Sequence, residues 1–280
     1  MEGLIINGII YGCLYALSAM GLVLIFKVCQ VVNFAQGEMA MFFAFIIFTF
    51  LNMKFHYGIA IILTIIISVL IGLIIERAIM RPIGGAHLSA MIATLGLIMI
   101  FNGMAGFLFG TEEHRFPSIT DGTTIGNQAM IIGITVVFML ILFCFFKFTK
   151  TGLGVRAVSQ DHFTSRLMGV SVKRVTSITW ALAAVLACVT GMLVASQTTL
   201  TITMMQEIHL KAFCSAVLGG FNSFLGPVVG GVILGVSENL FGSISVSFIK
   251  WKSVFSFGLI IIMLIIKPNG IMGTKYRKKV

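Results

Sequence analysis

Leu4–Phe26 is the feature that most constrains this chain, because none of its 23 residues is charged. A bilayer core about 30 Å thick is crossed by roughly 20 apolar residues in an α-helix, so the run is long enough to span a membrane. Lys27 follows the run and no basic residue precedes it, whereas a signal peptide has its positive charge before a shorter apolar stretch. The run therefore predicts a membrane-spanning helix.

Seven more apolar segments recur along the sequence: Gly58–Ile75, Leu88–Phe109, Gln128–Phe146, Val175–Leu200, Ser253–Ile266 and, short or interrupted by glycine, Met39–Leu51 and Gly226–Phe241. Strands of a membrane barrel would instead alternate apolar and polar residues over about ten positions. The pattern predicts an all-α integral membrane protein, a polytopic helical bundle of 8–9 transmembrane segments. The number of segments stays open at Thr201–Leu225.

The composition excludes the main soluble classes of protein. Of the 280 residues, 58% are hydrophobic and 10% are charged, whereas soluble domains have about 45–50% and about 25%. So few charges do not cover the surface of a water-soluble globule, which rules out a soluble enzyme, a soluble nucleic-acid binder and a disordered chain. The net charge of +10 therefore needs another explanation.

The placement of the basic residues supplies that explanation. Lys147–Arg174 has six basic residues and one acid, and residues 267–280 have five basic residues and no acid. Gly110–Asn127 has three acids and one Arg. Because Lys and Arg are retained on the cytoplasmic side, these segments predict an external N-terminus and a cytoplasmic C-terminus. The charge records orientation in the lipid membrane, and no nucleic acid is expected as a partner.

The sequence lacks the usual signals for catalysis and for metal or nucleotide binding. The five cysteines and five histidines form neither a Cys-x-x-Cys pair nor a His-Glu-x-x-His motif. There is no Gly-x-x-x-x-Gly-Lys-Ser/Thr loop for ATP and no Gly-x-Ser-x-Gly elbow of a serine hydrolase. We expect a non-enzymatic protein with no catalytic residue, no metal and no cofactor of its own.

Polar residues interrupt the apolar sequence soon after the first predicted span. Asn33, Gln36 and Glu38 lie there between two apolar stretches with almost no loop. Non-helical backbone near a membrane needs protein or a water-filled cavity to satisfy its polar groups, and a buried carboxylate needs a specific partner. The segment is either a broken helix on a translocation pathway or a cytoplasmic turn in which Asn33 or Glu38 caps the next helix.

A second interruption combines Gly219, Gly220, Asn222 and Pro227, a composition that breaks a helix. Such a break in a transporter indicates its pathway or a hinge. Gly-x-x-x-Gly pairs follow this interruption, and another lies in the first predicted span. For these pairs we favour close packing of helix backbones over substrate contact.

The predicted cytoplasmic segment 147–174 contains its own helix signals. Asp161 is a good N-cap and Gly169 a good C′ residue, which predicts a short helix between them. Phe163 and Leu167 are four residues apart and share a face of that helix. An exposed apolar face indicates docking to a partner, and the alternative is a basic loop that lies on an anionic membrane leaflet.

At these places the sequence resembles a known family. The segments "NFAQGE", "ERAIMRPI", "TGLGVRAVSQD", "KAFCSAVLGGFNSFLGPVVGGVILGVSE" and "KPNGIMG" are similar to motifs of permeases from branched-chain amino-acid ABC importers. The LivH-type subunit is the closer match, and the likeness runs from Asn7 to Gly273. Gln36 stands where His is commoner in the family.

The resemblance implies a multi-chain uptake system in a bacterial inner membrane. Residues 1–280 would form a single transmembrane permease domain with broken helices, internal pseudo-repeats, a coupling loop at 147–174 and a cytoplasmic tail at 267–280. The implied partners are a second homologous permease, two cytoplasmic ATP-binding subunits and an external substrate-binding protein. Leucine, isoleucine and valine would be the substrates, and urea or short amides are the alternative for the same architecture.

A stand-alone secondary transporter or channel is the alternative of a different class, with Glu38 or Glu238 as its coupling carboxylate. We interpret Glu238 instead as an outer-interface residue near the end of a span. The residues to which the resemblance assigns coupling to the ATPase are Arg156, Asp161, Phe163, Leu167 and Gly169. The residues that we assign to the translocation pathway or a hinge are Asn33, Gln36, Glu38, Gly219, Gly220 and Asn222.

Overall fold

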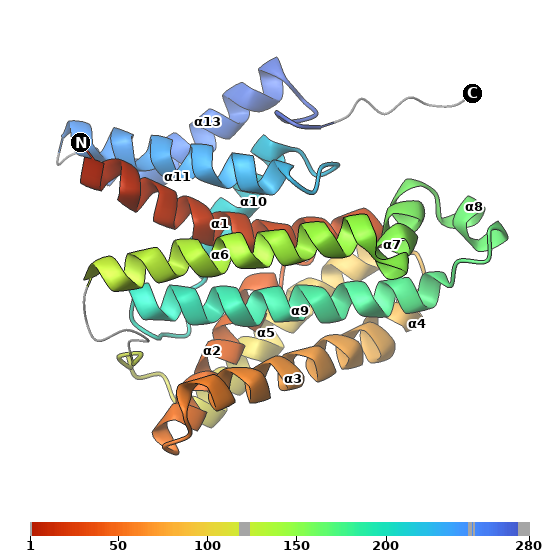
Figure 1. Cartoon of the computed structure of the whole chain (residues 1–280), viewed down its shortest axis with the longest axis horizontal. Helices are drawn as coiled ribbons and strands as arrows, with labels where there is room; N and C mark the ends of the chain where they lie inside the picture. The colour runs from red at the N-terminus through yellow and green to blue at the C-terminus, as the bar shows by residue number, and fades with distance from the viewer. Residues whose placement is uncertain (1, 118–123, 246–247, 249, 274–280) are drawn as a thin grey trace. The chain divides into compact units, whose positions relative to one another are not determined.

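The structure is a computed structural model that describes residues 2–117, 124–245, 248 and 250–273 (Figure 1). Asp121 and most of the predicted cytoplasmic tail, residues 274–280, lie outside the described residues. The chain divides into two compact units, of which unit 1 contains Met1–Val23 and Glu207–Val280 and unit 2 contains Leu24–Gln206. The prediction of one permease domain over residues 1–280 stays a prediction.

The described residues form helices joined by loops, with one isolated antiparallel bridge between His114 and Leu200. The helix α1 (Glu2–Cys29) begins in unit 1 and ends in unit 2. The further helices of unit 2 are α2 (Gln36–Asn52), α3 (Tyr57–Ile75), the π-helix η1 (Glu76–Met80), α4 (Arg81–Ile83), α5 (His87–Phe109), α6 (Thr124–Phe148), α7 (Lys150–Gln160), α8 (His162–Leu167) and α9 (Val172–Gln197). Those of unit 1 are α10 (Gln206–Gly219), α11 (Gly226–Ile244) and α13 (Lys252–Ile266).

The predicted apolar segments all form helices. Among the described residues, six helices are long and apolar enough to cross a membrane, namely α1, α3 with its continuation, α5, α6, α9 and α11. The apolar helices α2 and α13 are shorter. These eight helices match the eight predicted segments and confirm an all-α polytopic membrane protein. The segment that sequence left open, Thr201–Leu225, contains the 14-residue helix α10.

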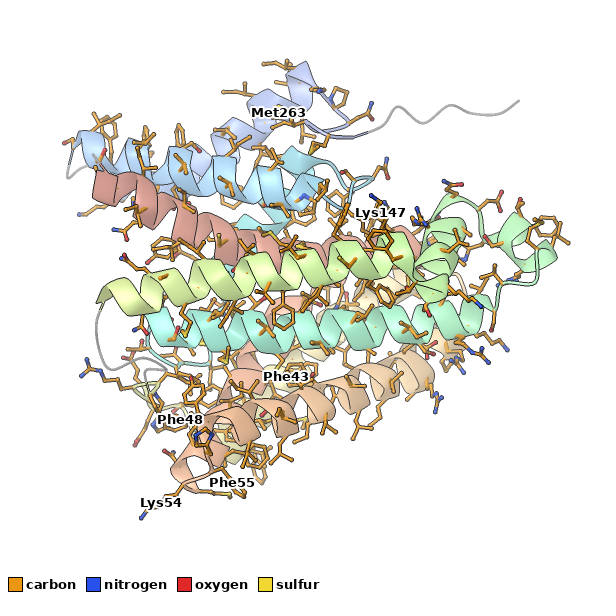
Figure 2. All side chains as sticks on the ribbon, in the orientation of Figure 1. Phe43, Phe48, Lys54, Phe55, Lys147 and Met263 are labelled. Atoms are coloured by element: carbon orange, nitrogen blue, oxygen red, sulfur yellow. The ribbon has the colours of Figure 1, made fainter. Side chains whose placement is uncertain are left out.

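The core of unit 2 forms where α9 packs against α2 and α3. Gly191 of α9 touches the backbone of Ala40 in α2, and a Cβ at Gly72 of α3 would lie 2.8 Å from the carbonyl oxygen of Trp180. The absence of a side chain at both glycines lets the helix backbones approach closely. Phe43 of α2, which is labelled in Figure 2, is fully buried.

In unit 1 the Gly-x-x-x-Gly pairs bring α1 against α11. A Cβ at Gly8 would lie 2.8 Å from the Cα of Val236, and one at Gly12 would lie 2.8 Å from the Cα of Val232. These distances leave no room for a side chain, so the predicted role of the glycines in backbone packing is confirmed. On another side α11 packs against α13.

Candidate functional site

The structure confirms the short helix predicted within segment 147–174. Asp161 Oδ1 accepts the backbone N–H groups of Phe163 at 2.7 Å and Thr164 at 3.0 Å, so Asp161 is the N-cap of α8. The N–H groups of Thr164 and Phe163 stabilise the carboxylate and hold the pKa of Asp161 below its ordinary value. The cap therefore contributes at neutral pH, and it is lost only as the pH falls through that lowered pKa.

Gly169 ends α8 as predicted. Its φ of +79° is in the left-handed region, which glycine adopts without strain. Gly169 N–H donates to Arg166 O and Val170 N–H donates to Ser165 O, each at 3.0 Å. This pair of bonds is the Schellman arrangement, and it satisfies carbonyls that the end of a helix leaves without partners.

The predicted apolar face of α8 is exposed. The exposed fractions are 71% for Phe163, 72% for Leu167 and 80% for Met168. Arg156 of α7 is also exposed. This helix starts two residues after the end of α6, which is near Lys147 (Figure 2). A six-residue helix with fixed ends and the Met168 that follows it thus present three large apolar side chains, which is a surface suited to docking.

The first polar interruption is a buried break between two helices. After α1 ends, Gln30 has a φ of +55°, and residues 31–35 are not helical. Asn33 is fully buried, and its Oδ1 accepts the N–H of Ala35 at 3.2 Å. Its Nδ2 donates to Gln36 Oε1 at 3.1 Å. The side chain of Asn33 therefore replaces part of the hydrogen bonding that the broken backbone has lost.

Two further helices of unit 2 hold this break in place. Gln36 Nε2 donates to the Ala183 carbonyl of α9 at 2.9 Å. Thr94 Oγ1 of α5 accepts the N–H of Phe34 at 3.3 Å. The amides of the interruption thus bond to neighbouring protein, as non-helical backbone inside a membrane protein requires.

The alternative in which Asn33 or Glu38 caps the next helix is wrong. Ala35 occupies the N-cap position of α2, with no capping bond from a side chain. Asn33 is engaged two residues before the helix begins, and Glu38 lies inside its first turn. Glu38 is 7% exposed, and its Oε2 has no hydrogen-bond partner among the described residues.

The second interruption is a tight turn between α10 and α11 in unit 1. Gly219 and Gly220 are buried, whereas Asn222 is exposed. Gly220 has a φ of +98°, and a Cβ there would lie 2.6 Å from Asn269 O, so both the conformation and the space require glycine. Met272 N–H donates to Gly219 O at 3.0 Å and helps to satisfy the end of α10.

The site residues that the sequence singles out fall into three groups. The break in unit 2 brings together Asn33, Gln36 and Glu38. The α7–α8 loop of unit 2 contains Arg156, Asp161, Phe163, Leu167 and Gly169. The turn in unit 1 contains Gly219, Gly220 and Asn222. Their roles in translocation and in coupling stay predictions.

Glu238 has partners inside unit 1, and the interpretation that it lies at the outer interface near the end of a span stays a prediction. Glu238 is 5% exposed within α11, and its Oε1 pairs with Lys211 Nζ of α10 at 2.7 Å. Tyr15 and Ser256 each direct a hydroxyl at Glu238 Oε2 at 3.4 Å. The signal that could have revealed this pair is one lone acid and one lone base, each in its own apolar segment.

A second ion pair, between buried Glu76 and exposed Arg81, lies where α3 becomes η1. Arg81 makes a bidentate contact to Glu76, with its Nη2 at 2.9 Å from Oε2 and its Nε at 3.1 Å from Oε1. Ser177 of α9 donates to the same Oε2 at 2.9 Å. The pair fastens the π-helical end of α3 to α9, five residues after α9 begins. Within the described residues, no group of three or more His, Cys, Asp or Glu side chains could hold a metal ion.

Comparison with known proteins identifies a family that the sequence matches. The profile of the family described as "Branched-chain amino acid transport system / permease component" matches residues 4–264. The high-affinity branched-chain amino acid permease LivH of Salmonella typhimurium is 30% identical over 98% of this chain and 96% of its own length. A probable LivH of Methanocaldococcus jannaschii is 28% identical over 99% and 94%. The fructose import permease FruG of Bifidobacterium longum is 25% identical over 79% and 71%.

A solved structure has a similar fold. PsaBC from Streptococcus pneumoniae in complex with Fab matches 94% of this chain and 91% of its own, with a TM-score of 0.53 and 14% sequence identity. At that identity the match describes the helical architecture alone. The likeness of fold extends over nearly the whole chain, as the likeness of sequence to LivH does.

Proposed function

The chain belongs to the permease family of branched-chain amino acid transport systems, and from that membership we propose that it is the transmembrane permease subunit of an ATP-binding-cassette importer for leucine, isoleucine and valine. An external binding protein delivers the substrate, and two cytoplasmic ATPase subunits drive its translocation. The relatives named for branched-chain amino acid transport support this substrate class. The chain itself contributes no ATPase site, no catalytic residue and no cofactor.

A second homologous permease completes the transmembrane part of the proposed importer. The whole assembly lies in a bacterial inner membrane, with the N-terminus of this chain outside and its C-terminus in the cytoplasm. The basic segment 147–174 supports this orientation, because it has six basic residues and one acid. The coupling residues of α7 and α8 then face the ATPase subunits.

The exposed apolar face of α8 is the observation on which the coupling role depends. Phe163 and Leu167 are more than two-thirds exposed on a helix whose two ends are fixed by Asp161 and Gly169. A rigid helix can transmit movement from a partner, and an apolar face gives that partner something to bury. Docking of α8 in a cleft of an ATPase subunit satisfies both conditions.

The test introduces charge on this face. Phe163→Asp and Leu167→Asp, in the reconstituted importer, are expected to abolish ATP-dependent leucine uptake and to release the ATPase subunits during purification. His162→Asp is the matched control, because it puts the same charge on the same helix, and His162 is neither three nor four residues away from Phe163, Leu167 or Met168. Retention of uptake and of ATPase association in both apolar-face variants would contradict the coupling role.

Two further measurements separate the alternatives. Valine and isoleucine are expected to compete with leucine for uptake, whereas urea and acetamide are not. Liposomes that contain this chain without ATPase subunits are expected to show no leucine flux under an ion gradient. Flux through the chain alone would establish a secondary transporter or channel in place of the importer.

A further inference from the structure

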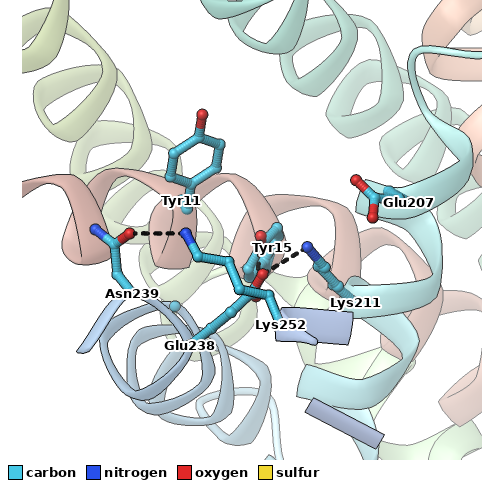
Figure 3. Close-up of a pocket in the computed structure, with 8 residues that line it drawn as sticks. Tyr11, Tyr15, Glu207, Lys211, Glu238, Asn239 and Lys252 are labelled. Carbon is cyan, nitrogen blue, oxygen red and sulfur yellow. Dashed lines mark hydrogen bonds and ion pairs between the residues drawn. The ribbon is translucent and has the colours of Figure 1, made fainter. Parts of the chain in front are cut away.

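Unit 1 contains a pocket that the proposed coupling and hinge residues do not use. It has a volume of about 190 Å³, whereas pockets for drug-sized ligands have about 300–1,000 Å³. Its polar lining comes from α1, α10, α11 and α13 (Figure 3). Two acids, Glu207 and Glu238, and two bases, Lys211 and Lys252, line it, so its formal charge is zero.

One acid and one base of the lining neutralise each other. Lys211 Nζ lies 2.7 Å from Glu238 Oε1, and both side chains are at most 11% exposed. Lys211 also lies over the ring of Tyr15, with its Nζ 5.7 Å from the ring centroid. The pair lines the pocket without net charge, so it attracts a charged group of a ligand only weakly.

Lys252 differs from Lys211 in its partners. Its Nζ donates to Asn239 Oδ1 at 3.3 Å, a bond to a neutral group, and no carboxylate pairs with it among the described residues. Its aliphatic chain passes over Gly242, where a Cβ would collide with it. The glycine therefore makes room for Lys252 to extend its ammonium group along the pocket, as Figure 3 shows.

Glu207 provides the charge of opposite sign. It lies at the start of α10, and one oxygen accepts the hydroxyl of Ser253 at 3.1 Å. Figure 3 shows Glu207 and Lys252 on different sides of the pocket, with Lys211 and Tyr15 between them. The pocket thus offers one available anion and one available cation that do not neutralise each other directly.

We propose that this pocket binds an α-amino acid in its zwitterionic form, with the carboxylate at Lys252 and the ammonium group at Glu207. This assignment rests on the proposed function, because it names the place in the chain where the transported amino acid is held. The rings of Tyr11 and Tyr15 supply apolar surface for its side chain. A dianion such as phosphate is disfavoured, because the lining has no net positive charge.

The test dissects the two charges of the ligand. The full chain in lipid nanodiscs is titrated with L-leucine, with 4-methylpentanoate, which lacks the ammonium group, and with 3-methylbutylamine, which lacks the carboxylate. Trp251, next to Lys252 and 58% exposed, reports binding through its fluorescence, and loss of the signal in Trp251→Phe identifies its source. Leucine is expected to bind at least about tenfold more tightly than either analogue, since each loses one charge-assisted contact.

The variants assign each charge to its partner. Lys252→Gln is expected to remove the preference for leucine over 3-methylbutylamine and to keep the preference over 4-methylpentanoate. Glu207→Gln is expected to do the reverse. Lys250→Gln, at an exposed neighbouring lysine outside the lining, is the matched control and keeps both preferences. Absence of saturable leucine binding, or persistence of both preferences in the variants, would overturn the assignment.

The same preparation distinguishes failure of this site from failure of the proposed function. ATP-dependent leucine uptake is measured in the importer assembled with the wild-type chain. If uptake occurs while the pocket shows no leucine binding, the pocket assignment is wrong and the importer stands. If the assembled importer moves no amino acid, the proposed function is wrong.

Discussion

Two buried polar clusters, one in each unit, differ in how they are built. In unit 2, Asn33 and Gln36 come from one short run of sequence, carry no charge and bond to each other and to backbone. In unit 1, Lys211 and Glu238 come from different helices, carry full charges and line a pocket. The first cluster repairs a broken backbone, and the second holds charges next to a space that a ligand can enter. A polar run that is conspicuous in a sequence is therefore not by itself the place of binding chemistry.

The largest expected effect comes from breaking the ion pair of unit 1. Lys211→Met leaves Glu238 buried without its cation, which is expected to lower the free energy of unfolding by about 3–5 kcal/mol. The double variant Lys211→Met with Glu238→Leu removes both charges and is expected to recover most of that loss, because no lone charge remains. Reversible unfolding in mixed micelles measures both.

Lys252→Met is the matched control for this prediction, since it removes a lysine of the same pocket that has no carboxylate partner. It is expected to change stability much less than Lys211→Met. If the double variant were as unstable as Lys211→Met alone, the contribution of Lys211 would come from packing of its aliphatic chain.

The helices and the α8 caps could be predicted because their signals are local. Each span is a continuous apolar run, and Asp161 and Gly169 lie at the spacing that a short helix requires. The sequence marks Lys211 and Glu238 each as a lone charge but does not pair them, because they are 27 residues apart and meet only through the packing of α10 and α11. The pocket depends on four helices, so no single stretch of sequence reports it.

The sequence does not predict α7, and the reason is different. Gly152 and Gly154 lower the helix propensity of this segment, and tertiary contact overrides that preference. Gly152 touches the backbone at Phe145 and Phe146, where a side chain would collide, and Thr149 caps the helix by accepting the N–H of Gly152 at 2.9 Å. The glycine that argues against a helix is thus what permits α7 to fold back against α6.

An intermediate effect is expected from the neutral cluster of unit 2. Gln36→Leu removes the acceptor of Asn33 Nδ2 and leaves that buried amide with a contact of 3.8 Å to Met39 Sδ. A buried donor without a good partner costs about 1–3 kcal/mol of unfolding free energy, less than an isolated buried charge. Thermal unfolding of the full chain in nanodiscs measures the change.

Gln160→Leu is the control for that change, because Gln160 is exposed at the end of α7. Its substitution is expected to stay within about 0.5 kcal/mol. A loss in Gln36→Leu equal to that of Lys211→Met would contradict the distinction between the two clusters, since an amide and a charge would then cost the same.

The smallest effect is expected from Glu38→Gln, although Glu38 is the one acidic residue in the unit 2 cluster. The substitution keeps the shape of the side chain, and Glu38 Oε2 has no hydrogen-bond partner among the described residues to lose. Stability is expected to change less than in Gln36→Leu, because Oε2 has no hydrogen bond to lose within the part of the chain that the structure describes. ATP-dependent leucine uptake is expected to continue, because the amide keeps the polarity that a pathway residue needs. A carboxylate that carried coupling protons would behave differently, because an amide does not titrate and uptake would stop at every pH. Glu238→Gln is the matched comparison, since there the same change weakens an ion pair at 2.7 Å and is expected to destabilise the chain more. Loss of uptake in Glu38→Gln with normal folding would show that transport depends on the carboxylate at the break in unit 2.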